Sequence, residues 1–108
     1  MSYKIIPTKV FEKELKALFK KYRSLKDDLN LLKLDLLENP KTGIHLGKDV
    51  YKIRLAIKSK GKGKSGGARV ITHFKVTKET IYLLSIYDKS QESSISENQI
   101  IELIKQIL

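Results

Sequence analysis

Residues 50–58, with the sequence VYKIRLAIK, alternate between two kinds of side chain. A period of two is typical of a β-strand that buries one face, because successive side chains of a strand point to opposite sides of the sheet. The apolar positions are Tyr51, Ile53, Leu55 and Ile57, and the positions between them are Lys52, Arg54, Ala56 and Lys58. The segment therefore predicts a strand with one apolar and one basic face.

Two further strands are predicted after this one. Residues 60–67 consist largely of glycine, lysine and serine, so we expect a connecting loop there. A second strand begins at Ala68, residues 77–79 form a polar turn, and a third, continuously apolar strand covers residues 81–87. Because sequential strands with short connections favour antiparallel pairing, these segments predict an antiparallel sheet with the third strand in a central position.

The N-terminal part predicts a short strand and two helices. The strand covers residues 3–6 and ends at Pro7, after which Thr8 can cap the first helix. Ser24, with Asp27 three residues later, resembles a capping arrangement for a second helix that ends at residues 39–40, Asn-Pro. The helical stripes are Phe11, Leu15, Leu18, Phe19 and Tyr22, and then Leu25, Leu29, Leu32 and Leu36. The short turn between them predicts an antiparallel helical hairpin.

A third helix is predicted at the C-terminus. Ser96 and Gln99 have the spacing of a capping box, and the residues after them are unusually apolar. These residues are Ile100, Ile101, Leu103, Ile104, Ile107 and Leu108. Together the patterns predict an α+β fold of one domain over residues 1–108, with an N-terminal helical hairpin packed on a small antiparallel β-sheet and a C-terminal helix.

Composition limits the chemistry that the chain can perform. Its 108 residues contain no cysteine and two histidines, which excludes thiolate sites and makes a zinc site improbable, so no metal or cofactor is expected. The apolar stretch before Pro7 is too short for a signal peptide, and no apolar run approaches the length of a membrane span. We therefore expect a cytoplasmic protein without a membrane partner.

The net charge of +10 is concentrated in one hairpin. Residues 48–69 carry eight basic side chains against the single acid Asp49. Because Lys52, Arg54 and Lys58 share a strand face, and the hairpin brings Arg69 back beside them, we expect a contiguous basic surface suited to a phosphodiester backbone. His73 shares the strand parity of Arg69 and is a reserve candidate for this surface, whereas His45 is expected to be an ordinary loop residue.

Three segments resemble the RelE/ParE toxins of type II toxin-antitoxin systems, and most closely their HigB-like members. They are KIR at 52–54, GKSGGARVI at 63–71 and IYLLSIYDK at 81–89. The resemblance implies a RelE-like fold and a ribosome-dependent mRNA endonuclease, an mRNA interferase of the translational A site. The ribose 2′-oxygen would attack the adjacent phosphate without a metal. Asp88 departs from the family pattern, in which a small residue is common at that position.

The resemblance also implies roles for individual residues. Arg54 and Arg69 would stabilise the transition state, Lys64 and Lys89 would contact phosphate or transfer protons, and Tyr87 would stack on a base or transfer a proton. An equally weighted alternative for Tyr87 is a packed residue at the strand end. The remaining RNA-binding candidates are Lys52, Lys58, Lys60, Lys62 and His73.

The implied partners are mRNA on the ribosome and a cognate antitoxin, with a HigA-like helix-turn-helix domain, whose complex would bind operator DNA. The toxin itself would meet DNA only through that complex. Two alternatives stay open at this point. One is a ParE-like inhibitor of DNA gyrase, and the other is a basic RNA-binding module without catalysis.

Overall fold

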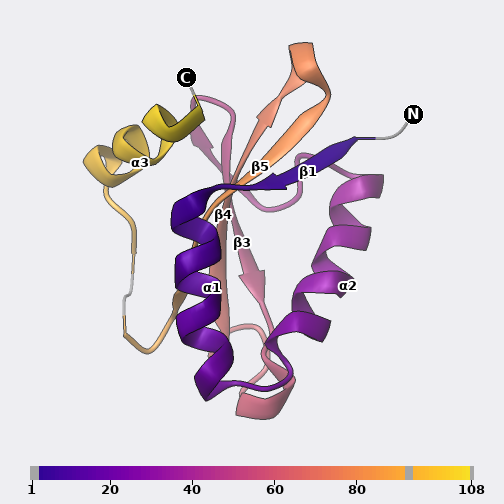
Figure 1. Cartoon of the computed structure of the whole chain (residues 1–108), viewed down its shortest axis with the longest axis vertical. Helices are drawn as coiled ribbons and strands as arrows, with labels where there is room; N and C mark the ends of the chain where they lie inside the picture. Colours follow the sequence, from indigo (N-terminus) through magenta and orange to yellow (C-terminus); the bar gives the residue numbers. More distant parts are fainter. Residues whose placement is uncertain (1–2, 92–93, 108) are drawn as a thin grey trace.

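The computed structural model describes residues 3–91 and 94–107. Within these residues a five-stranded sheet carries two helices on one face and a third helix on the other (Figure 1). The elements are β1 (Lys4–Pro7), α1 (Lys9–Lys21), α2 (Leu25–Glu38), β2 (Ile44–Gly47), β3 (Val50–Leu55), β4 (Ala68–Lys75), β5 (Thr80–Asp88) and α3 (Glu97–Ile104), with short 3₁₀ segments at Lys58–Lys60, Val76–Lys78 and Lys105–Ile107. The predicted α+β class is confirmed.

The sheet has the strand order β1-β5-β4-β3-β2. The predicted antiparallel pairing is confirmed for β3 with β4 and for β4 with β5. β5 has a neighbour on each side, because it lies between β4 and β1. Two features were not predicted. β1 adds to β5 in parallel, and β2 pairs with β3 as an edge strand that includes His45. A parallel pair joins segments far apart in the chain, and β2 is too short to show a period, so neither leaves a local signal.

The larger core lies between the sheet and the helical hairpin. Phe11, Leu25 and Leu36 are almost completely buried there against the apolar side chains of four strands. Thr8 joins the start of α1 to β5, because its hydroxyl accepts a hydrogen bond from the Phe11 N–H and donates to the Leu83 carbonyl. The predicted Thr8 cap is confirmed, and the alternation over 50–58 buries its apolar set as expected.

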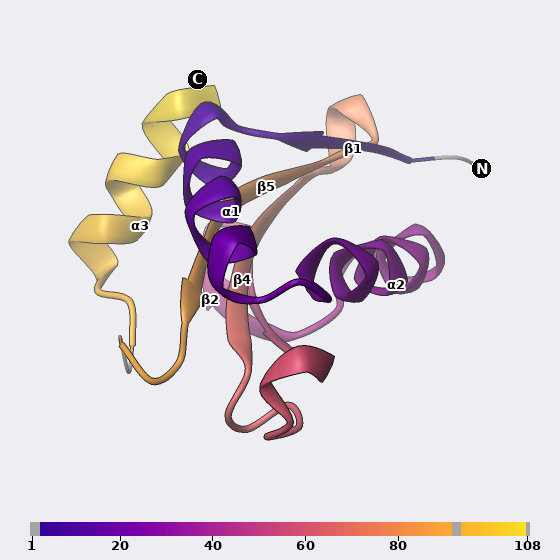
Figure 2. The same ribbon diagram turned by 60° about the horizontal axis from the view of Figure 1, so that its bottom comes forward.

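A smaller core lies under α3. Ile100 packs with Val50, Ile71, Leu84 and Tyr87, and the rest of the helix covers the same apolar patch. In Figure 2, α3 lies beside α1 and far from α2. The predicted capping box is present, with reciprocal hydrogen bonds of 2.7 and 3.1 Å between Ser96 and Gln99. The apolar side chains of α3 therefore cover part of one face of the sheet, while Ile101 is exposed; Leu108 lies outside the described residues.

Candidate nucleic-acid interface

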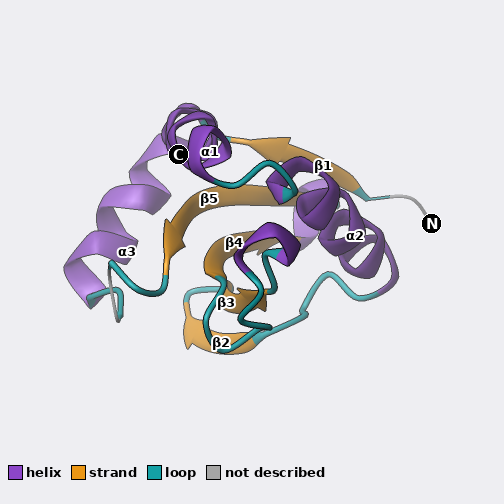
Figure 3. Ribbon diagram, turned by 90° about the horizontal axis from the view of Figure 1, so that it is seen from below, coloured by secondary structure: helices purple, strands orange, loops and turns teal. Residues whose placement is uncertain are grey.

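Register across three strands brings predicted site residues into one row. Arg54 of β3 pairs with Arg69 of β4, which pairs with Tyr87 of β5. All three side chains point to the face opposite α1 and α2, because their strand neighbours belong to the larger core. In Figure 3, which shows the molecule from below, β5 is drawn below α1 and between α3 on the left and α2 on the right. The hairpin geometry expected for Arg54 and Arg69 is confirmed.

The three members of the row differ in accessibility. The Arg54 side chain is exposed to solvent, whereas Arg69 is 4% exposed and Tyr87 is 7% exposed. Tyr87 belongs to the apolar cluster under α3, and it also lines the hollows between α1, β5 and α3. In this structure Arg54 is the member that an RNA phosphate can reach directly.

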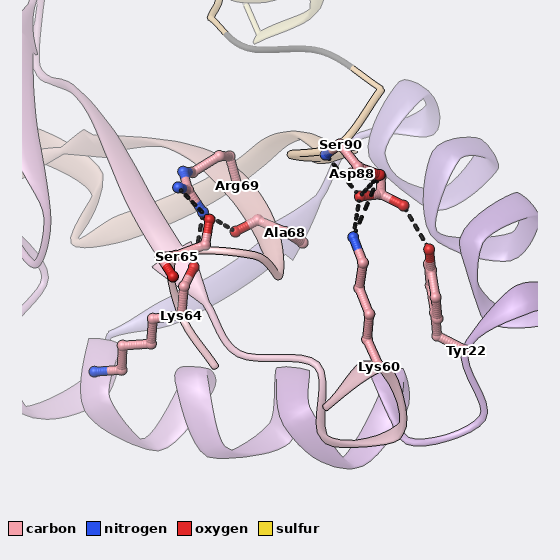
Figure 4. A network of polar contacts seen from close by, with 8 residues as sticks. All are labelled: Tyr22, Lys60, Lys64, Ser65, Ala68, Arg69, Asp88 and Ser90. Carbon is pink, nitrogen blue, oxygen red and sulfur yellow. Dashed lines mark hydrogen bonds and ion pairs between the residues drawn. The ribbon is translucent and has the colours of Figure 1, made fainter. Parts of the chain in front are cut away.

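The Arg69 guanidinium holds the loop that follows β3. Its Nη1 donates to the carbonyl oxygens of Lys64 at 2.9 Å and of Ala68 at 3.1 Å, and its Nη2 donates to the Ser65 carbonyl at 3.3 Å (Figure 4). The planar fork of donors suits this set of carbonyls, which a lysine could not satisfy together. No carboxylate of the described residues forms an ion pair with Arg69, so its positive charge is not neutralised by an acid there.

Lys60 is paired internally, contrary to the expectation that it faces RNA. Its Nζ lies 2.6 Å from the Asp88 carboxylate, which is buried and also accepts a 2.6 Å hydrogen bond from the Tyr22 hydroxyl (Figure 4). Ser90 donates to the same carboxylate through its backbone N–H and its hydroxyl. Asp88 lies two residues after the core-facing Ile86, so its side chain points to the same face of the sheet, the one covered by α1 and α2. The ion pair therefore holds Lys60 on that face.

Two pKa values are shifted by this network. Burial raises the pKa of the Asp88 carboxyl, but the hydrogen bonds from Lys60, Tyr22 and Ser90 outweigh it and hold the pKa well below the usual range. The hydrogen bond to Asp88 raises the pKa of the Tyr22 phenol, and burial acts in the same direction. The network therefore contains a carboxylate that stays ionised and a phenol that stays protonated at neutral pH.

The first turn of α2 binds the start of the same loop. The predicted Ser24–Asp27 cap is wrong, because the Ser24 side chain makes no capping hydrogen bond. Its hydroxyl instead donates to Asp28 at 2.7 Å and accepts the Ser59 N–H at 2.8 Å, while Asp28 accepts the Lys58 N–H at 3.2 Å. Asp28 lies on the apolar stripe of α2 between Leu25 and Leu29, and an acid at such a position is the sequence signal that could have indicated a buried partner.

A groove of about 250 Å³ lies between α2 and the hairpin. Lys58 and Lys64 line it, with Asp28 and Asp35 on its α2 side, and Arg54 borders it from β3 while its side chain is directed to the other face of the sheet. The exposed Lys62 belongs to the same loop. Lys89 emerges where β5 ends, and its backbone N–H donates to the Gly67 carbonyl at 3.1 Å. The loop therefore presents several cations to one approaching polyanion.

His73 lies apart from this groove. It pairs with Val50 and with Tyr82, four residues along β4 from Arg69, or about 13 Å at the usual rise of a strand. Burial lowers the pKa of the His73 imidazole, which leaves it neutral at pH 7. The structure therefore keeps His73 apart from Arg69 and the loop lysines, although the predicted contact Lys52 is its diagonal neighbour across β3 and β4.

Two general features of the described residues bear on the kind of site. In the ranges 3–91 and 94–107, no three His, Asp or Glu side chains come together as metal ligands. No helix there is both long and apolar enough to cross a membrane.

Comparison with known proteins places the fold in a defined group. A family model described as RelE toxin of the RelE/RelB toxin-antitoxin system matches residues 4–107. A mutant of E. coli toxin RelE in the free state superposes with a TM-score of 0.65 at 21% identity, covering 100% of both chains. The isolated E. coli RelE toxin gives a TM-score of 0.63 at 22% identity, covering 99% of this chain and 100% of that one. The intact E. coli RelBE toxin-antitoxin complex gives 0.62 at 20% identity over 81% of this chain and 96% of its own.

Proposed function

Because the chain belongs to the RelE toxin family of RelE/RelB toxin-antitoxin systems, we propose that it is a ribosome-dependent mRNA endonuclease that stops translation. The exposed cations of the hairpin carry the proposal, since the Arg54, Lys58 and Lys64 side chains are exposed and none of them forms an ion pair with a carboxylate in the described part of the chain. Such a cluster neutralises a phosphodiester and the additional charge that develops on it during cleavage.

The proposed reaction is an internal transfer at phosphorus. The ribose 2′-oxygen loses its proton and bonds to the adjacent phosphorus, while the bond from phosphorus to the 5′-oxygen breaks and the leaving oxygen takes up a proton. The products are a 2′,3′-cyclic phosphate and a 5′-hydroxyl. The step requires a proton acceptor, charge stabilisation and a proton donor, all of which side chains can supply.

Within this reaction the residues take different positions. Arg54 is proposed to contact the phosphate directly, and the buried Arg69 opposite it on β4 is proposed to add its positive charge without contact. Lys64 and Lys89 are proposed for backbone contact or proton transfer, and Lys52, Lys58 and Lys62 for phosphate contact. Tyr87 can take part only if α3 shifts, because it packs under that helix.

A cognate antitoxin is the proposed partner, and relatives have been crystallised in complex with RelB or with a RelB peptide. The proposal includes a HigA-like helix-turn-helix antitoxin that carries the complex to operator DNA. α3 uses its apolar face inside the fold, so the exposed Leu31, Leu34 and Leu37 of α2 are the better contact candidates. Co-expression with an operon neighbour tests this, and purification of the basic chain alone contradicts it.

Primer extension on a defined message in a reconstituted translation system tests the activity. Arg54→Ala is preferred to Arg69→Ala, because loss of Arg69 would also release the loop. We expect discrete cuts within codons that require ribosomes, persist in the control Lys105→Ala and disappear in Arg54→Ala. Lys105 is exposed and lies on the opposite side of the sheet from α2, in an exposed ion pair with Glu102.

Two other outcomes would reassign the function. Binding of RNA without any cut would indicate a non-catalytic module. Intact message despite growth arrest on expression would reject the endonuclease, and a DNA supercoiling assay would then test gyrase as the target.

A further inference from the structure

We propose that Asp88 is a positioning residue that, through Lys60 and Tyr22, fixes the loop 58–67 against the end of β5 so that the loop lysines meet RNA in one arrangement. The inference rests on the proposed endonuclease function and deepens it. It concerns Asp88 and Tyr22, which were not among the predicted site residues, and Lys60, which was predicted to bind RNA but is paired with Asp88.

The contacts of Asp88 carry the proposal. Its side chain is fully buried, and one oxygen accepts from Lys60 and Ser90 while the other accepts from Tyr22. These donors come from the basic loop, from the turn after β5 and from the end of α1. One carboxylate therefore joins three segments, and its donor Tyr22 lies 66 residues before it in the sequence.

Two more anchors hold the remaining parts of the loop. Asp28 and Ser24 bind the backbone N–H groups of Lys58 and Ser59 at its start, and Arg69 binds the carbonyls of Lys64 and Ser65 near its end. Asp88 holds the middle through Lys60. The anchors bind loop backbone and the Lys60 side chain, and the Lys58, Lys62 and Lys64 side chains are exposed.

These contacts order the loop and do not add to its positive charge. The loop contains Gly61, Gly63, Gly66 and Gly67, and a segment of this composition loses much conformational entropy when it is held in one form. A loop that needed only positive charge would leave Lys60 free, yet here its charge is neutralised. Fixing the cations before RNA arrives removes that entropy loss from the binding and chemical steps.

The decisive comparison is Asp88→Asn against Glu102→Gln. Both variants replace a carboxylate by an amide and raise the net charge by one, but Glu102 is exposed and lies on α3. If only charge mattered, both would bind RNA at least as well as the wild type and cut it equally. We expect Asp88→Asn to keep its KM or lower it, and to lose kcat by roughly 10- to 100-fold, the usual effect of a small misplacement. Equal kcat in both variants would overturn the proposal.

A second measurement reports on the loop without using activity. In amide hydrogen exchange by mass spectrometry, we expect loop 58–67 to exchange faster in Asp88→Asn and in Lys60→Met, with the sheet unchanged, and the double variant to be no worse than either single one. Uniform loss of protection would indicate a merely structural role and contradict the inference. If Asp88→Asn does not fold, Tyr22→Phe replaces it, because this variant removes one of the hydrogen bonds to Asp88. The same changes in kcat and in loop exchange are then expected for Tyr22→Phe. If the wild type did not cut message, the proposed endonuclease function would be rejected. The exchange rates of loop 58–67 would still show whether Asp88 holds the loop.

Discussion

At the level of single residues, the buried carboxylate of Asp88 makes the stability of the fold depend on pH in the acidic range. Its folded pKa lies below the value of 3.8 expected for a free side chain. A group of this kind stabilises the fold fully above its unfolded pKa, and the contribution is lost as the pH falls below that value towards the folded pKa. The acid limb of the stability curve therefore contains a contribution from this one side chain.

Replacing Asp88 by Asn is predicted to flatten that limb. We expect a lower free energy of unfolding than wild type at neutral pH, and a difference that shrinks between about pH 5 and pH 2 as the wild type loses the contribution. Urea denaturation followed by circular dichroism across this range measures it. Parallel curves for the two proteins would contradict the assignment.

Arg69 gives a second prediction at this scale. Arg69→Lys keeps the charge but loses the fork that binds several carbonyls, so we expect unfolding free energy to fall by about 1.5–3 kcal/mol, the usual contribution of a hydrogen bond involving a charged group. The same change at its exposed cross-strand neighbour, Arg54→Lys, is the control and should leave stability unchanged. Equal urea midpoints for both variants would show that the carbonyl contacts contribute little.

At the level of elements, the passage from the loop into β4 depends on one close approach. A Cβ on Gly67 would lie 2.1 Å from the Leu55 carbonyl oxygen, which is backbone and cannot move aside. Gly61 lies in the same loop with a φ of +73° and has nothing within 4 Å of the equivalent position. Substitution of Gly67 therefore tests the effect of a steric clash, and substitution of Gly61 tests the effect of backbone strain alone.

Alanine at these two glycines should have unequal effects. Gly61→Ala is expected to lose about 1–2 kcal/mol of stability from left-handed strain alone. Gly67→Ala should lose about 3 kcal/mol, because overpacking against backbone forces the hairpin apart. Thermal unfolding measures both, and similar melting temperatures would contradict the close approach.

At the level of the whole molecule, the charge of +10 predicts a salt-dependent affinity for RNA. For single strands the logarithm of the affinity falls with the logarithm of salt concentration, by about 0.7 for each neutralised phosphate. We expect Arg54→Ala and Lys64→Ala each to reduce the slope by about that amount, whereas Lys60→Met should leave it unchanged because Asp88 already neutralises that lysine. Fluorescence anisotropy with a short RNA at several salt concentrations provides the slopes, and a lower slope for Lys60→Met would mean that Lys60 reaches RNA.

The burial of Lys60 and Arg69 could not be predicted from the sequence, because it depends on contacts across the whole molecule. Lys60, Lys62 and Lys64 repeat at equal spacing in one glycine-rich loop, and nothing local distinguishes them. Only the meeting of the loop with Asp88, 28 residues later, selects Lys60 for burial. The strand pattern likewise predicted an exposed side chain for Arg69. In the structure the loop passes over it and supplies carbonyl groups that bind its guanidinium.

The sequence by itself determined the features that depend on neighbours within a few residues. These are the strand that begins at Val50 with its apolar and basic faces, the caps at Thr8 and Ser96, the end of α2 before Pro40, and the concentration of charge in one hairpin. The strand is shorter than predicted, because β3 ends at Leu55 and Lys58 begins a 3₁₀ segment. Backbone periodicity and local hydrogen bonds set such features directly. The tertiary structure alone decided the parallel pairing of β1, the burial of Tyr87 under α3 and the pairing of Lys60 with Asp88, because each depends on which distant segments pack together, and no local pattern encodes that choice.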